Sequence, residues 1–184
     1  SINTNNVKYM EGLFEGCISL EKLPNISVWN IDNVTNINNM FCYCCNLTTL
    51  PDISKWNINN ITSLESLFEG CKLLQALPEI SNWNLFNVTN IRRMFCGCSN
   101  LTTVPDISKW NTNNVKYMEN LFDGCTSLQV LPDISKWNVN NVESFNFLFR
   151  NCFSMSQMPN IKWNQNNSQQ INDKSLFDGC FNLI

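Results

Sequence analysis

The chain has 184 residues, a formal net charge of −3, a hydrophobic fraction of 43% and no histidine. This composition supports a buried core but gives neither the basic footprint of a nucleic-acid binder nor a polybasic membrane patch. No apolar run approaches the length of a membrane span. The absence of histidine removes the commonest general base, and we therefore expect no enzyme, metal site or cofactor.

The first structural unit covers roughly residues 7–33, and its apolar residues recur at intervals close to three. This spacing fits neither the alternation of a long strand nor the 3.6-residue period of a long helix. A continuous 3₁₀ helix would match, but such helices rarely exceed four residues. The spacing therefore predicts a coil of short extended pieces and bends. The apolar residues are Val7, Met10, Leu13, Cys17, Leu20, Leu23, Ile26 and Trp29.

The same unit recurs along the chain, with proline at 24, 51, 78, 105, 132 and 159. A fixed 27-residue period predicts a repeat solenoid of leucine-rich-repeat or β-solenoid type, in which each coil buries its apolar side against the next. We expect one domain over residues 1–184, with about seven coils and ~35 Å along the axis. Short parallel strands are expected at L-x-x-L-P (20–24 and equivalents) and at V-x-x-M, with a bend or short helical turn at L-F-x-x-C.

Longer similarities pair the coils into units of 54 residues, because "VKYMEGLFEGC" at 7–17 is nearly repeated four coils later at 115–125. The last unit breaks the pattern, and we expect an irregular coil or loop near residues 164–174. Both ends of the sequence fall inside a coil, which is the pattern expected of a segment from a longer repeat array.

Seven of the ten cysteines share one position of the repeat, and they are predicted to form a buried ladder of thiols. Cys42, Cys45 and Cys96 lie outside this column. Their C-x-C spacing fits structural zinc poorly, so we expect exposed or half-buried thiols there and no metal. The ladder cysteines are Cys17, Cys44, Cys71, Cys98, Cys125, Cys152 and Cys180.

Asparagine follows each tryptophan and precedes most of the next valines or isoleucines, so we expect stacked amides that satisfy backbone groups at turns. Seven N-x-[ST] sequons would be possible glycosylation sites if the chain entered a secretory route. They begin at Asn25, Asn33, Asn46, Asn60, Asn87, Asn100 and Asn166.

The stretch "NVTNINNMFCYCCNLTTLPDISKWNINN" at 33–60 resembles the repeats of BspA-like leucine-rich-repeat surface proteins of bacteria and protists. The shared features are N-V-T-N-x-x-x-M-F, C-x-x-L-x-x-L and D-I-S-x-W-N, and they recur through essentially the whole chain. The resemblance implies a cell-surface or secreted module that recognises proteins, cells or matrix without enzymatic activity.

The exposed pair inside each L-x-x-L differs from coil to coil, and we predict that these residues form the ligand face. A protein or glycan partner would contact it broadly and with little charge. The alternative is a structural rod or intracellular scaffold in a larger assembly, because the pairs lack aromatic residues. The predicted ligand residues are Glu21, Lys22, Thr48, Thr49, Gln75, Ala76, Thr102, Thr103, Gln129, Val130, Ser156 and Gln157.

Overall fold

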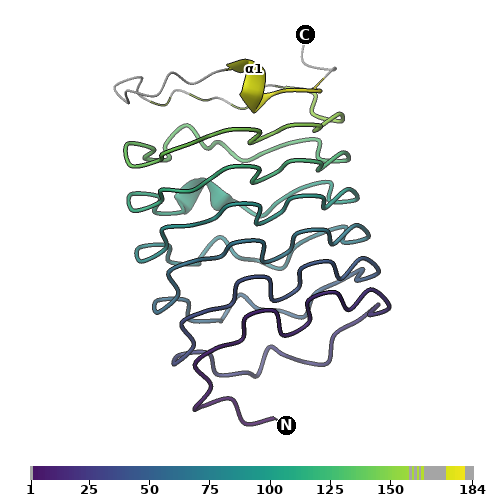
Figure 1. Cartoon of the computed structure of the whole chain (residues 1–184), viewed down its shortest axis with the longest axis vertical. Coiled ribbons are helices and arrows are strands. Elements are labelled where there is room, and N and C mark those ends of the chain that lie inside the picture. Colours follow the sequence, from purple (N-terminus) through teal and green to yellow (C-terminus); the bar gives the residue numbers. More distant parts are fainter. Residues whose placement is uncertain (1, 158, 160, 162, 164–172, 181–184) are drawn as a thin grey trace.

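The chain winds into a stack of similar coils that rises from the N-terminus to the C-terminus (Figure 1). The computed structural model describes residues 2–157, 159, 161, 163 and 173–180. In these residues the helices are the 3₁₀ helix η1 (Ile107–Lys109) and the helix α1 (Asp173–Leu176). We number the coils 1 to 7 by the phenylalanine in each: Phe14, Phe41, Phe68, Phe95, Phe122, Phe149 and Phe177.

Neighbouring coils pair in parallel at isolated positions 27 residues apart. Two bridges lie in the L-x-x-L segments and four lie in the V-x-x-M segments and their equivalents, as the sequence predicts. The described residues contain no longer strand, so the prediction of strands is wrong in extent. Turns flank each bridge, and the backbone is extended too briefly to form consecutive pairs. The bridges are Tyr9↔Asn36, Lys22↔Thr49, Ser63↔Asn90, Asn90↔Tyr117, Thr103↔Val130 and Tyr117↔Ser144.

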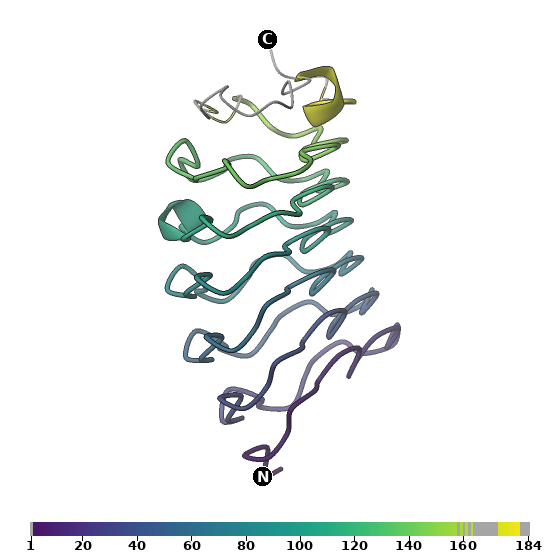
Figure 2. The same cartoon turned by 60° about the vertical axis from the view of Figure 1, so that its left-hand side comes forward.

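The L-F-x-x-C segment forms turns with left-handed residues and not a short helix. Positive φ angles recur in two columns of the repeat, and non-glycine residues occupy many of these positions. The left-handed residues turn the backbone so that every second N–H group of this segment points toward the next coil. The N–H groups of residues 10, 12, 14 and 16 all donate to carbonyl oxygens 26 residues later, at 2.8–2.9 Å. Coils are therefore joined along this side by a regular backbone ladder, and they stay in register along the stack (Figure 2).

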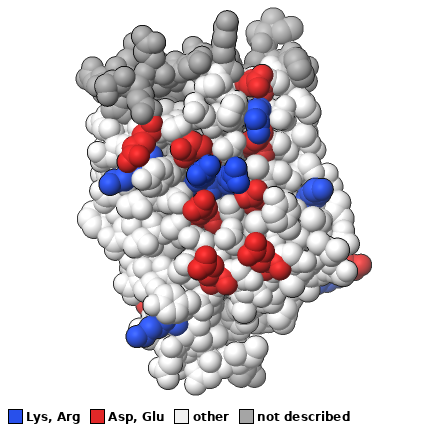
Figure 3. Space-filling view, in the orientation of Figure 1, with Lys and Arg blue, Asp and Glu red and all other residues white. Residues whose placement is uncertain are grey.

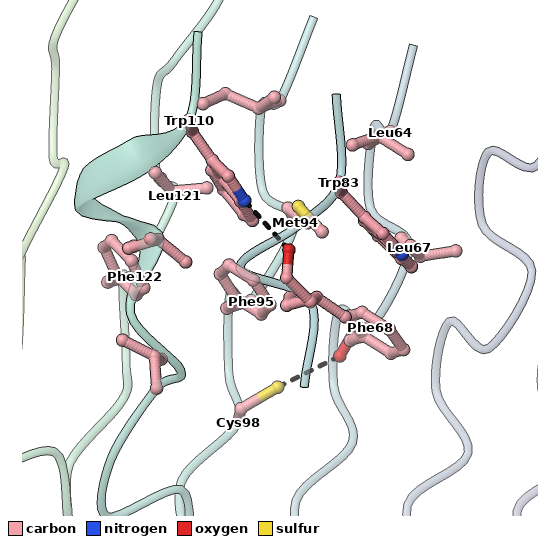
Figure 4. Close-up of a cluster of buried hydrophobic side chains, with 14 of the residues drawn as sticks. Leu64, Leu67, Phe68, Trp83, Met94, Phe95, Cys98, Trp110, Leu121 and Phe122 are labelled. Carbon is pink, nitrogen blue, oxygen red and sulfur yellow. Dashed lines mark hydrogen bonds between the residues drawn. The ribbon is translucent and has the colours of Figure 1, made fainter. Parts of the chain in front are cut away.

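The core between the two sides of each coil consists of stacked columns. The phenylalanine rings of successive coils lie 5.3–5.9 Å apart, with interplanar angles of 3–12°. Tryptophans form a second column, in which the rings of Trp110 and Trp137 are 6.2 Å apart. Leucine and methionine fill the space between the columns (Figure 4). Large aromatic side chains thus bury most of their surface against their own repeats.

Two polar groups in this core are bonded to the preceding coil. The Cys98 thiol donates to the carbonyl oxygen of Phe68 at 3.1 Å, and the Trp110 indole Nε1 donates to that of Ile80 at 3.1 Å (Figure 4). Equivalent thiol bonds measure 2.9–3.1 Å, and equivalent indole bonds measure 2.9–3.3 Å. These buried thiols and indoles therefore have partners, as burial requires.

The cysteine ladder is confirmed in the interior and wrong at its first member. Cys44, Cys71, Cys98, Cys125 and Cys152 are buried, and Cys180 is half-buried. Cys17 is exposed, because no preceding coil covers it in the described residues. The predicted irregularity near 164–174 falls largely on residues 164–172, which lie outside the described part.

The asparagines bond mainly to backbone groups, and in the described residues no asparagine amide bonds to an amide at the same position of the next coil. Asn60 Nδ2 donates to the carbonyl oxygen of Asp32 at 2.6 Å, 28 residues earlier. The same bond recurs in four further coils at 2.6–2.7 Å. The prediction that asparagine satisfies backbone groups is confirmed, but the bonds tie one coil to the turn of its neighbour.

Candidate functional site

The twelve predicted ligand residues form a strip, here called the ligand strip, that is solvent-exposed throughout except at one residue. Thr48 is half-buried, because its hydroxyl donates to the carbonyl oxygen of Glu21 at 3.3 Å. The bridges Lys22↔Thr49 and Thr103↔Val130 hold members of neighbouring coils in register. The structure therefore places these residues on one continuous surface that a partner can reach.

A shallow pocket of about 210 Å³ interrupts the ligand strip between coils 5 and 6. Gln129, Val130 and Gln157 of the strip line it together with Leu131, Pro132, Asp133 and Pro159. The pocket wall thus combines two amide groups and one carboxylate with the apolar side chains of proline and leucine. The volume is below the range of drug-sized ligand sites, so the pocket suits one side chain or one sugar ring of a larger partner.

A second surface, which the sequence analysis missed, flanks the buried methionine and phenylalanine of each coil. We call it the charged face, and it consists of residues 8, 9, 11, 12, 15 and 16 of coil 1 and the positions at 27-residue steps through coil 6. All tyrosines and arginines of the sequence lie on it, and these are frequent hot-spot residues of protein interfaces. Figure 3 shows its acidic and basic side chains gathered toward the middle of the visible face. The six residues are Tyr9, Tyr43, Tyr117, Arg92, Arg93 and Arg150.

The strongest electrostatic contact on the charged face joins coils 5 and 6. The Arg150 guanidinium donates to both carboxylate oxygens of Asp123, whose side chain is only 8% exposed. The bonds to Asp123 raise the pKa of Arg150. The Arg150 guanidinium also lies 4.3 Å from the centre of the Phe147 ring. Bidentate geometry and partial burial make this pair stronger than a usual surface ion pair.

Neutral groups bond to three other carboxylates of this face: Glu11, Glu65 and Glu69. Asn36 Nδ2 donates to Glu11 at 2.8 Å, and Asn90 Nδ2 donates to Glu65 at 2.9 Å. Glu69 accepts from the hydroxyls of Ser66 and Tyr43. These bonds orient the carboxylates without neutralising their charge, so the negative potential of the face is retained.

Cys42 and Cys96 also belong to the charged face. Burial, followed by the charge of Glu69, raises the pKa of each thiol to about 12. Cys42 is buried and Cys96 half-buried, so the expectation of an accessible thiol is wrong for Cys42. The thiols stay protonated at neutral pH and are poor nucleophiles or metal ligands. The described residues contain no cluster of three or more potential metal ligands.

Six of the seven sequon asparagines are exposed, and Asn166 lies outside the described residues. The side-chain amides of Asn33, Asn60 and Asn87 donate to carbonyl oxygens of the preceding coil. Asn25 Oδ1 accepts from Ser27 of its own sequon. In the described part of the chain, the side chains of Asn46 and Asn100 make no hydrogen bond. The structure thus divides the described sequons into those whose asparagine side chain is hydrogen-bonded and those whose asparagine side chain is not.

These features define a repeat protein with a constant interior and exposed faces that vary between coils. The chain belongs to the family described as "Mycoplasma protein of unknown function, DUF285", whose model matches residues 1–76 and 62–183. Among curated proteins, none matches the chain. No helix in the described residues has the length and apolarity that a membrane crossing requires.

Solved structures match only weakly. A leucine-rich repeat protein from Bacteroides ovatus ATCC 8483 is 15% identical with a TM-score of 0.28, over 80% of this chain and 51% of that protein. A leucine rich cell surface protein from Faecalibacterium prausnitzii A2-165 is 18% identical with a TM-score of 0.26, over 94% of this chain and 68% of that one. This chain thus spans about half the length of the first. Similarities at this level carry no argument about function.

Proposed function

We propose that this protein is a non-enzymatic recognition module of the BspA-like leucine-rich-repeat type, located at a cell surface, that binds a protein or glycan partner through the ligand strip. One observation carries the proposal. The buried columns repeat almost unchanged from coil to coil, whereas the exposed residues of the strip differ between neighbouring coils. Solenoids present variable residues on a rigid repeated support in this way when they recognise extended partners.

The pocket at coils 5 and 6 favours recognition over a purely mechanical role. A partner side chain or sugar ring would contact Val130 and Pro132 with its carbon atoms and the amides of Gln129 and Gln157 with its polar atoms. Several such contacts along the strip, each weak, would add to a broad interface. Multivalent display on a surface would then raise the apparent affinity.

The experiment compares binding by the native chain with binding by two variants of equal charge. Probes are a glycan array and surfaces coated with matrix glycoproteins, and binding is measured by biolayer interferometry. The test variant is Thr103→Lys with Val130→Lys, which places two cations at a bridged pair beside the pocket. The control is Val28→Lys with Asn82→Lys, since both positions are exposed and their equivalents in three other coils are already lysine: Lys55, Lys109 and Lys136.

Loss of binding in the test variant, with retention in the control, would support the ligand strip as the recognition surface. Equal binding by both variants would exclude this part of the strip. A native chain that binds none of the probes would favour the alternative of a structural rod.

A further inference from the structure

The charged face alternates between two kinds of coil. Coils 1, 3 and 5 carry two carboxylates each at the positions equivalent to 11 and 15, whereas coils 2, 4 and 6 carry an amide, a thiol or an arginine there. The acidic residues are Glu11, Glu15, Glu65, Glu69, Glu119 and Asp123, and the others are Asn38, Cys42, Arg92, Cys96, Asn146 and Arg150. A second surface with the same alternation would complement this one if each of its acidic coils faced a coil without carboxylates at these positions.

We propose that two copies of this chain associate through their charged faces, with antiparallel stacks and a twofold axis between coils 3 and 4. The axis lies in the interface and is perpendicular to the stack. Coil 1 then faces coil 6 of the second copy, coil 2 faces coil 5, and coil 3 faces coil 4. Each residue meets the residue at the same position of the facing coil, as an isologous interface requires.

This arrangement places three pairs of opposite charges face to face and no two like charges. Glu65 faces Arg92 of the second copy, Glu15 faces Arg150, and Lys8 faces Glu143. The remaining carboxylates face amides or thiols, so that none faces another carboxylate. These pairs are Glu11 with Asn146, Glu119 with Asn38, Asp123 with Cys42 and Glu69 with Cys96. Because each contact occurs twice, the three ion pairs become six in the dimer.

Side-chain size is complementary as well. Tyr43, which is 47% exposed, faces Gly124 of the second copy, and Phe147 faces Gly12. Tyr9, which is 72% exposed, faces Ser144. Large residues therefore meet small ones, so that the aromatic rings can be covered without collision. Buried tyrosine and arginine are typical anchors of protein interfaces.

Neighbouring arrangements bring like charges together. An axis through coil 3 would place Glu65 against itself and Glu11 against Glu119. An axis through coil 4 would place Arg92 against itself. Parallel stacks would face each acidic coil with the same acidic coil. Such contacts oppose association and select among registers. Moving the second copy by two coils along the stack still pairs acidic coils with the other kind, but only four coils of each copy then overlap. The axis between coils 3 and 4 therefore gives the largest complementary contact.

Arg92 and Glu65 have no ion-pair partner in the described part of their own chain, whereas Arg150 already binds Asp123. Among the described residues, the ion pairs within 4 Å are Asp106–Lys109 and Asp123–Arg150, so neither Arg92 nor Arg93 is paired. The carboxylate of Glu65 is already oriented by Asn90. Since exposed ion pairs carry much of the contact, the dimer should weaken as salt increases.

The test uses two charge-reversal variants and their mixture. Glu65→Arg with Glu143→Lys makes both facing pairs positive, and Arg92→Glu with Lys8→Glu makes both negative. We expect the native chain to sediment as a dimer in 50 mM salt and each variant to sediment as a monomer. Mixing the two variants should restore a dimer, because every reversed group then meets its complement. Native mass spectrometry identifies the restored dimer as containing one copy of each variant.

The mixture separates association from effects inside one chain, because repulsion between adjacent coils cannot be relieved by adding a second variant. A control, Glu21→Lys with Glu79→Lys, changes charge equally away from the charged face and should stay dimeric. If a variant at the half-buried Glu65 or Arg92 fails to fold, Lys8→Glu and Glu143→Lys alone, both at exposed positions, provide the same mixing test. A monomeric native chain, or folded variants that form no mixed dimer, would overturn the proposal.

Discussion

The indole Nε1 of Trp110 donates to the carbonyl oxygen of Ile80 in the preceding coil, at 3.1 Å. The same oxygen also accepts from the backbone N–H of Trp83 in its own coil, at 3.1 Å. One carbonyl group thus closes the turn of its coil and holds the next coil above it. The thiol bond from Cys98 to the carbonyl of Phe68 repeats this arrangement on the other side of the core.

Replacing Trp110 with phenylalanine should lower the free energy of unfolding by about 1–2 kcal/mol, because a buried hydrogen bond and part of the packed ring are lost. Trp29→Phe is the matched control, since its indole makes no inter-coil bond in the described residues. We expect the control to cost less than Trp110→Phe in urea unfolding followed by tryptophan fluorescence and circular dichroism. Equal losses would show that packing, and not the indole bond, stabilises the contact.

The left-handed turn glycines provide a second prediction. Gly16 and Gly70 have φ angles of +67° and +71°, so alanine at either costs about 1 kcal/mol of backbone strain. A Cβ at Gly70 would also lie 2.5 Å from the Tyr43 ring, whereas a Cβ at Gly16 has no neighbour within 4 Å. Gly70→Ala should therefore destabilise the chain by about 1–3 kcal/mol more than Gly16→Ala. Similar melting temperatures for the two variants would argue against this close approach.

The ion pair between Arg150 and Asp123 provides a third prediction. Arg150→Met leaves a largely buried carboxylate without its partner, and we expect a loss of about 2 kcal/mol, since Arg150 is partly exposed. Lys109→Met is the control, because the side chains of Lys109 and Asp106 are 70% and 51% exposed. It should change stability by less than about 0.5 kcal/mol. Thermal unfolding at low and high salt would compare the two, and a loss in both variants of the same size would contradict the prediction.

The repeat period predicted most of the interior of this fold. Residues at one phase, such as Phe68 and Cys98, occupy equivalent buried positions because each coil packs on a copy of itself. The period could not predict the length of the strands, since turn geometry limits pairing to single bridges. Nor did it reveal left-handed residues such as Arg93 and Phe147, whose types do not favour positive φ.

The charged face could not be predicted from the sequence for a different reason. Charged residues such as Glu69 and Arg93 are far apart in the sequence. They lie on one surface only because the chain winds into stacked coils. The residues around the methionine and phenylalanine also vary between coils, and this variation could have indicated the charged face. The prediction of a ligand surface rested instead on the variable L-x-x-L pairs. Burial of Cys42 likewise depends on its neighbours in adjacent coils.

Alkaline pH should destabilise the fold through the buried thiols. The folded pKa of Cys44 is about 11 and those of Cys42 and Cys96 are about 12, against an ordinary value of 9.0. Because unfolding lets these thiols ionise more easily, stability is retained below pH 9 and falls as pH rises toward 12. The melting temperature should be flat from pH 7 to 8.5 and then decrease.

Serine at Cys42 and Cys96 would remove two of these titrations, so this variant should lose less stability between pH 8.5 and 11 than the native chain. Cys17→Ser, at an exposed position, should leave the slope unchanged. Identical pH profiles for all three proteins would refute the assignment of the alkaline transition to buried thiols.

The sequons give the last prediction, which concerns modification of the folded chain. The amide nitrogen that would receive a glycan is hydrogen-bonded to the preceding coil in Asn60, at 2.6 Å, and the bond must break for transfer. Asn46 and Asn100 are exposed and their amides are not engaged in the described structure. An oligosaccharyltransferase acting on the purified folded protein should therefore modify Asn46 and Asn100.

The same reaction on denatured protein provides the control, because unfolding releases every sequon amide from its neighbouring coil. Peptide mass spectrometry should then find glycan at the three engaged positions as well: Asn33, Asn60 and Asn87. The ratio of folded to denatured occupancy is the informative quantity, since it cancels the intrinsic preference of the enzyme for each sequence. A ratio for Asn60 equal to that for Asn46 would mean that the inter-coil amide bond does not protect the site.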